Sequence, residues 1–108
     1  MTFELGDILL LNAFPYSSLG AVKKRPALVL ADTGDEDLLL CRITSETVRD
    51  PYDLGVQDWK GAGLLLPSSI RLSKMATLTK RLVLRKLGRL GSPERRRVRS
   101  TLKKLFII

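Results

Sequence analysis

The segment Lys23-Lys24-Arg25-Pro26-Ala27-Leu28-Val29-Leu30 decides how this chain folds. Three consecutive cations lead into a proline, and the proline opens an apolar run that continues to Ala31. Proline fixes its own φ and biases the preceding residue toward extended backbone, so Arg25 is expected at the entrance of a strand. The run from Ala27 to Ala31 is short and aliphatic, as in a strand buried on both faces. A guanidinium held at the mouth of such a strand is well placed to bind an anion, the alternative being a cluster that is merely solvated.

Further apolar runs predict more strands along the chain. They are expected at residues 8–11, 37–44, 68–79 and 82–88. The turn-rich segment 12–20 predicts a loop, and the polar segment 45–60, which contains Asp50-Pro51, predicts a longer one. Five or six short, mostly antiparallel strands favour a small, strongly bent β-barrel over a βαβ sheet.

The last segment has a different pattern. Ser92-Pro93-Glu94 provides an N-cap, a first-turn proline and an acid near the positive end of a helix. Apolar residues then recur at spacings of three and four, at Val98, Leu102, Leu105 and Phe106. The other face carries Arg95, Arg96, Arg97, Arg99, Lys103 and Lys104. The pattern predicts a C-terminal amphipathic helix on a mainly β domain.

Length and composition limit the class of protein. The 108 residues, 44% apolar and 28% charged, predict one globular domain over residues 1–108. No apolar stretch approaches the ~20 residues that cross a bilayer, and no secretory signal is visible at the start. The single cysteine, Cys41, lies among leucines, and there is no histidine. We therefore expect a cytoplasmic protein without membrane contact, metal or cofactor.

The net charge of +8 is unevenly distributed. Residues 1–70 carry 6 basic and 10 acidic side chains, whereas residues 71–108 carry 13 basic side chains and one acid, Glu94. This asymmetry indicates a polyanionic or acidic partner for the last third of the chain, or a well-solvated surface that favours solubility.

Several short motifs, in order along nearly the whole chain, resemble the PemK/MazF family. They are Gly6-Asp7-Ile8, Lys24-Arg25-Pro26-Ala27-Leu28-Val29, Ile43-Thr44-Ser45, Ala62-Gly63-Leu64, Ser69-Ile70-Arg71, Ala76-Thr77-Leu78 and Leu87-Gly88-Arg89-Leu90. The resemblance implies a toxin of a bacterial type II toxin–antitoxin system with an SH3-like barrel of the MazF/CcdB type. It also implies a homodimer that cleaves single-stranded RNA without a metal. A cognate antitoxin would inhibit it through an acidic C-terminal segment laid into the RNA groove.

The resemblance also implies roles for individual residues. Arg25 matches the catalytic or substrate-binding arginine of the Arg-Pro motif, the alternative being an ion pair with a loop carboxylate. Thr44 matches an active-site threonine, and Ser45 beside it is expected to bind RNA, although hydroxyls at a strand end also cap turns. Arg71 matches an arginine that serves as proton donor or phosphate ligand, the alternative being a solvated cation.

Other residues are expected to contact RNA. Lys23, Lys24 and Lys74 are expected to bind RNA, and Tyr16, like Phe14, would stack on a base or anchor its loop. Ser73 stands where several family members have an aspartate, which leaves the general base unassigned. Glu46 and Asp58 are conceivable substitutes.

Two other functions remain open. The same barrel resembles CcdB, which acts by binding DNA gyrase, so a non-enzymatic gyrase poison is one. An SH3-like RNA- or DNA-binding module using the basic last third is the other. The Arg-Pro and Ile-Thr-Ser motifs favour the ribonuclease, because a simple binder does not need both.

Overall fold

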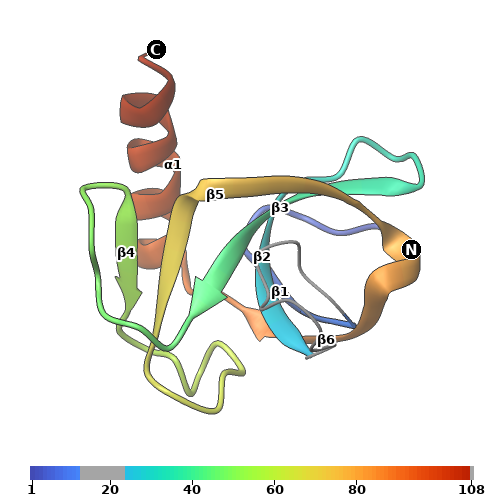
Figure 1. Ribbon diagram of the computed structural model, residues 1–108, viewed down its shortest axis with the longest axis horizontal. Coiled ribbons are helices and arrows are strands. Elements are labelled where there is room, and N and C mark those ends of the chain that lie inside the picture. Colours follow the sequence, from blue (N-terminus) through green and yellow to red (C-terminus); the bar gives the residue numbers. More distant parts are fainter. Residues whose placement is uncertain (13–23, 108) are drawn as a thin grey trace.

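One antiparallel sheet and one helix form the part of the chain that the computed structural model describes, residues 1–12 and 24–107 (Figure 1). The strands are β1 (Asp7–Leu11), β2 (Arg25–Ala31), β3 (Asp37–Thr44), β4 (Asp53–Val56), β5 (Ser68–Thr79) and β6 (Val83–Arg89). A single 3-10 turn, η1 (Lys80–Leu82), joins β5 to β6, and α1 (Ser92–Phe106) follows.

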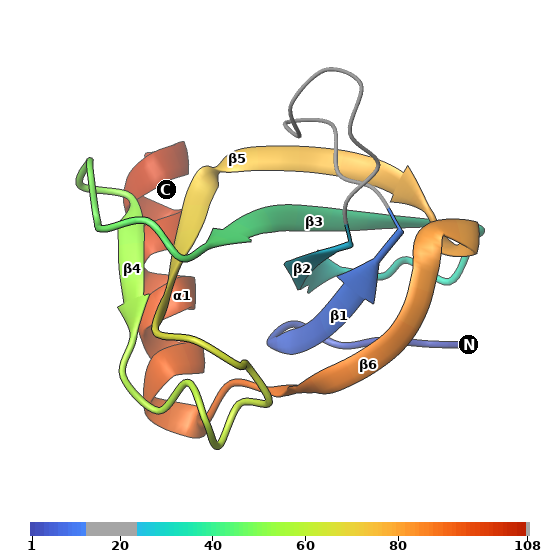
Figure 2. The ribbon, with the colours of Figure 1, turned by 60° about the horizontal axis from the view of Figure 1, so that its bottom comes forward.

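The strands pair in the order β4-β5-β3-β2-β1-β6, and every pair is antiparallel. The long strand β5 bends sharply, so the sheet curls into a barrel-like shape (Figure 2). The pairing explains the bend, because Cys41 lies opposite Met75 whereas the next residue, Arg42, lies opposite Arg71. The residues between these partners on β5 form a bulge, which bends a strand and increases its twist. The six strands and the C-terminal helix confirm the predicted mainly β fold with a strongly bent sheet.

Two apolar clusters lie on the two faces of the sheet. Successive residues of β1 show the alternation, because Ile8 belongs to the cluster that includes Val98 of α1 while Leu9 belongs to the other. Each of these three side chains is fully buried, and burying one aliphatic side chain contributes about 1.5–3 kcal/mol. The helix therefore covers one face of the sheet, and the curled strands close over the other.

The structure corrects one expected loop. Residues 53–56, inside the segment predicted as a long excursion, form β4 and pair with β5. The other predicted strands occur within one or two residues of the expected limits, and β3 and β5 have the predicted limits.

The start of the helix also differs from the expectation. Gly91 is the N-cap and Ser92 is the first helical residue, so the prediction of Ser92 as N-cap was wrong. The Ser92 hydroxyl accepts a hydrogen bond from Arg95 instead, at 3.0 Å. Glu94 is buried, and its carboxylate accepts hydrogen bonds from the backbone N–H groups of Gln57 and Asp58. The acid predicted at the positive helix end thus also fastens the segment after β4 to α1.

The cysteine of the chain lies in the core. Cys41 is fully buried, and this burial raises the pKa of its thiol. None of the helices in the described ranges is both long enough and apolar enough to span a membrane.

Candidate functional site

A groove of about 420 Å³ opens where β2 begins and β3 ends. Its lining combines three kinds of side chain. Cations come from Lys24, Arg25 and Arg85; hydroxyls come from Thr44, Ser45 and Ser68; and most of the remaining surface is aliphatic, including Leu10, Pro26, Ile43 and Leu64. This volume falls in the range of small-molecule sites, about 300–1,000 Å³.

Strand pairing brings Arg25 and Thr44 to the same end of the sheet. Ala27 of β2 lies opposite Arg42 of β3. Arg25 precedes Ala27 by two residues and Thr44 follows Arg42 by two, so in this antiparallel pair both lie at the same end. Arg25 and Thr44 are both half-buried. The Glu46 backbone N–H donates to Thr44 Oγ1 at 3.2 Å, which holds the hydroxyl oxygen and leaves its proton to donate elsewhere.

A close crossing of two backbones positions the opposite wall. A Cβ added to Gly88 would lie 2.1 Å from the Ala62 carbonyl oxygen, and one added to Gly63 would lie 2.1 Å from the Leu87 carbonyl oxygen. Gly63 also has a φ of +93°, which side chains disfavour. Glycine at both positions lets residues 61–66 lie directly against β6, and this contact places Leu64 and the exposed Leu65 along the groove.

The charged side chains of the described residues that line the groove are all basic. No aspartate or glutamate of the described ranges lines it. Within those ranges Lys24, Arg25 and Arg85 also make no ion pair. The alternative for Arg25, a pair with a loop carboxylate, therefore does not occur among these residues. Lys24, Arg25 and Arg85 therefore surround one concavity without an ion pair among the described residues, and such an arrangement attracts anions rather than cations.

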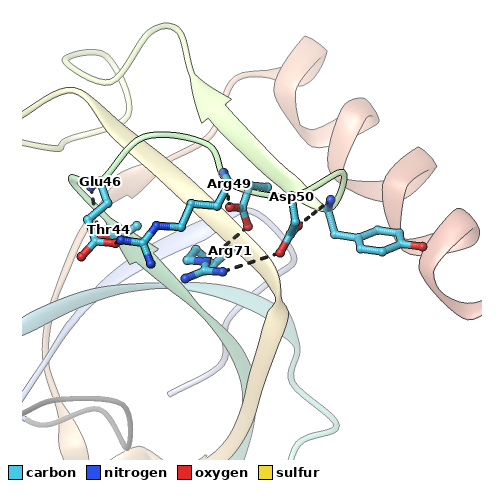
Figure 3. Close-up of polar contacts among 7 residues, drawn as sticks. Thr44, Glu46, Arg49, Asp50 and Arg71 are labelled. Carbon is cyan, nitrogen blue, oxygen red and sulfur yellow. Dashed lines mark hydrogen bonds and ion pairs between the residues drawn. The ribbon is translucent and has the colours of Figure 1, made fainter.

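Arg71 lies outside this groove. Its Nε is 3.3 Å from Asp53 Oδ1. One of its terminal nitrogens is 3.6 Å from Asp50 Oδ2 (Figure 3). The Asp53 side chain is 1% exposed and that of Arg71 is 12% exposed. The other Asp53 oxygen accepts the backbone N–H of Arg49. Arg71 therefore neutralises acids on β4 and in the segment before it, and the solvated cation considered from the sequence does not describe it.

The two acids considered as general bases do not line the groove. Glu46 pairs with Arg49, toward which its side chain extends (Figure 3). Asp58 accepts the backbone N–H of Gly61 and so belongs to the turn before the groove wall. In the part of the chain that the structure describes, no three His, Cys, Asp or Glu side chains gather as a metal site requires.

The remaining predicted RNA contacts divide into three groups. Lys24 and Ser45 line the groove. Lys74 lies in the bulge of β5, where it is exposed, and it does not line the groove. Tyr16 and Lys23, together with Phe14, lie outside the described residues.

Arg85 of β6 is the charged groove residue that sequence reasoning missed. It stands in the basic run Arg85-Lys86, and nothing in that run distinguishes the two residues. The pairing with β1 gives the two residues different surroundings. Lys86 forms an ion pair with Asp7 at 3.0 Å, whereas Arg85 lines the groove.

Comparison with solved structures reveals the same fold over nearly the whole chain. A mycobacterial endoribonuclease in complex with its cognate antitoxin is 14% identical, with a TM-score of 0.77 and coverage of 99% of this chain and 97% of that one. The toxin MazF-mt6 of Mycobacterium tuberculosis is 17% identical, with a TM-score of 0.75 and coverage of 94% and 97%. MazF of Deinococcus radiodurans is 20% identical, with a TM-score of 0.75 and coverage of 100% and 99%.

Sequence comparison gives the family directly. No curated protein matches the chain. The family model described as PemK-like, MazF-like toxin of type II toxin-antitoxin systems matches residues 4–106. Since this match spans the sheet, the groove and the helix, the chain belongs to the PemK/MazF-like family of type II toxins.

Proposed function

We propose that this toxin is a metal-independent endoribonuclease that cleaves single-stranded RNA in the groove at the ends of β2 and β3. The observation that carries the proposal is the charge of the groove, where Arg25 stands beside hydroxyl groups and no described acid opposes it. A phosphodiester fits this lining, because guanidinium and hydroxyl groups both donate hydrogen bonds to phosphate oxygens. The structural similarity to an endoribonuclease, at 14% sequence identity, supports the fold on which the proposal depends.

The proposed nucleophile is the 2′-hydroxyl of the RNA itself. Its oxygen attacks phosphorus, which increases the negative charge on the non-bridging oxygens in the transition state. The bond from phosphorus to the 5′-oxygen breaks, and its electron pair leaves with the 5′-oxygen. Arg25 would bind the non-bridging oxygens through the planar, forked N–H groups of its guanidinium, and Thr44 would donate a hydrogen bond from its hydroxyl to one of them. Because no described carboxylate lines the groove, charge stabilisation rather than a carboxylate base accounts for the rate.

Cleavage of a single-stranded RNA oligonucleotide in excess EDTA tests this function. We expect the wild-type chain to cut it and a fully 2′-deoxy version to remain intact, because the nucleophile is then missing. Arg25→Ala should lower the cleavage rate by about 100-fold or more, the effect of losing one donor to a developing oxyanion. Arg25→Lys keeps the positive charge but loses the forked guanidinium, so its cleavage rate should lie between those of the wild type and Arg25→Ala.

Circular dichroism of the Arg25→Ala protein provides the control for folding. Intact RNA with folded wild-type protein at high concentration would overturn the proposal. Growth arrest with undegraded RNA and a stable gyrase complex would indicate a CcdB-like poison instead. Steeply salt-dependent binding without turnover would indicate a nucleic-acid-binding module.

The proposed partners are an antitoxin with an acidic C-terminal segment and a second copy of the chain. The groove cations suit carboxylates as well as phosphates, and one structurally similar protein is solved with its cognate antitoxin. Inhibition of cleavage by a short polyglutamate peptide tests whether the groove accepts an acidic segment. Light scattering tests the dimer, for which the expected mass is twice 12.1 kDa.

A further inference from the structure

Arg85 brings a second guanidinium into the groove from β6. We propose that Arg85 binds the scissile phosphodiester together with Arg25, in the role that the sequence motif gave to Arg71. The inference deepens the proposed endoribonuclease function and depends on it. Three structural features carry it: the engagement of Arg71, the bulge that turns Arg85 into the groove, and the absence of a described partner for Arg85.

Arg71 is already engaged by two carboxylates. Its Nε lies 3.3 Å from Asp53 Oδ1, and the Asp53 side chain is 1% exposed. Turning the guanidinium toward the groove would leave that buried carboxylate without its cation, and an uncompensated buried charge is strongly destabilising. Arg71 is therefore held at the β4–β5 pair by the fold itself.

A bulge in β6 directs Arg85 into the groove. Leu10 of β1 lies opposite Arg85, but the next residue, Leu11, lies opposite Val83, so Leu84 is the extra residue. Residues directly opposite each other in a sheet point to the same face. Leu10 also lies opposite Pro26 of β2, so Pro26, Leu10 and Arg85 form a row across three strands. All three line the groove.

Arg85 is exposed and available to a ligand. It has no ion pair or hydrogen bond to another side chain within residues 1–12 and 24–107. Its neighbour Lys86, by contrast, is paired with Asp7. Strands β2 and β6 flank β1, so their backbones are separated by about 10 Å, twice the usual spacing between strands. Two arginine side chains that start at this separation can reach one phosphate between them.

The step that Arg85 would assist needs no other reactant. The 2′-oxygen forms a bond to phosphorus, the bond to the 5′-oxygen breaks, and the products are a 2′,3′-cyclic phosphate and a 5′-hydroxyl end. The 2′-hydroxyl loses one proton to water and the 5′-oxygen gains one from water. Arg85 donates hydrogen bonds to the non-bridging oxygens and transfers no proton to the RNA.

Single-turnover cleavage of an RNA oligonucleotide tests the inference with Arg85→Ala, Arg85→Lys and Arg81→Ala. Arg81 is a matched control, because it is exposed in η1 and does not line the groove. We expect Arg85→Ala to slow cleavage by about 100-fold, as for loss of one donor, and Arg85→Lys to restore part of the rate. Arg81→Ala should stay within about twofold of wild type.

Binding of the 2′-deoxy oligonucleotide at several salt concentrations provides a second measurement. Loss of one phosphate contact should reduce the slope of log K against log salt by about 0.7 for Arg85→Ala, with no such change for Arg71→Ala. If wild type cleaves RNA but Arg85→Ala cleaves it as fast, or if Arg71→Ala changes the slope in its place, the assignment of Arg85 is wrong. If wild type does not cleave RNA at all, the proposed function fails first, so the two failures are distinguishable.

Discussion

At the scale of single residues, the pair Arg71–Asp53 shows how a buried charge determines the role of its partner. Asp53 on β4 is almost fully buried, and Arg71 on β5 is the cation beside it. Removing one member of such a pair costs more than the pair contributes, because the remaining charge stays in a poorly solvated site. A motif arginine therefore has a structural explanation that its position in the sequence does not reveal.

We predict that Arg71→Ala lowers the free energy of unfolding by about 3 kcal/mol, measured by urea titration at pH 7. Arg49→Ala is the matched control, since Arg49 is 59% exposed and pairs with an exposed acid, Glu46. Its effect should be at most about 1 kcal/mol, as for surface ion pairs. Equal effects of the two substitutions would show that burial does not distinguish the pairs.

Asp32 provides the prediction for pH dependence. Hydrogen bonds from the backbone N–H groups of Gly34 and Phe3, together with Lys80, lower the pKa of Asp32 below its usual 3.8. A lowered pKa adds stability that is present above the ordinary value and is lost as the pH falls through the lowered value. Asp32→Asn should therefore be less stable than wild type at pH 7, and this difference should shrink below about pH 4. Urea titrations at pH 7 and pH 2.5 check it, and a constant difference would contradict it.

At the scale of elements, local pattern explains most of the sheet but not β4. Strands such as Asp37–Thr44 carry a long apolar run, so their own sequence specifies them. β4 has four residues, includes Gly55 and follows a proline, which locally indicates a turn. It becomes a strand through pairing with β5 and through Glu94 of α1, which binds the backbone just after it. Such distant contacts leave no local pattern.

The contact of residues 61–66 with β6 gives a prediction at this scale. Gly88→Ala would place a Cβ 2.1 Å from the Ala62 carbonyl oxygen, so the groove wall must move away from β6. We expect a loss of about 2–3 kcal/mol of stability, as in other overpacked sites. RNA cleavage should fall as well, because Leu64 and its neighbours shift.

Gly55→Ala is the control for this substitution. An added Cβ at Gly55 meets no heavy atom within 4 Å, so its stability should change by less than about 1 kcal/mol. Thermal unfolding and cleavage of both variants provide the comparison. Equal stability of the Gly88→Ala and Gly55→Ala proteins would show that the crossing of backbones tolerates a side chain.

At the scale of the whole molecule, the site divides into what local motifs specify and what the sheet assembles. Arg25 and Thr44 are predictable because each marks the end of a strand with a clear local pattern, and the two strands are neighbours. Arg85 is not predictable, because a bulge against β1 decides which residue of the run Arg85-Lys86 enters the groove. The ion pair of Arg71 is not predictable either, because its partner Asp53 lies 18 residues away in the sequence.

The whole molecule also carries a second cationic surface, on α1. Arg96, Arg99 and Lys103 follow one another at spacings of three and four along the exposed side of the helix, and none has an ion pair among the described residues. The helix has one acid, Glu94, and that acid is buried. This surface therefore contributes positive potential without contributing a groove residue.

A positive surface outside the groove should accelerate the encounter with RNA without changing the chemical step. We predict that the triple substitution Arg96→Ala, Arg99→Ala and Lys103→Ala lowers kcat/KM several-fold at low salt and leaves kcat unchanged. The difference in kcat/KM should disappear toward 1 M salt, where the screening length is about 3 Å. Arg25→Ala, by contrast, should lower kcat at every salt concentration, because its loss acts on the transition state. A fall in kcat for the triple variant would mean that the helix surface takes part in cleavage, and the separation of the two cationic surfaces would then be wrong.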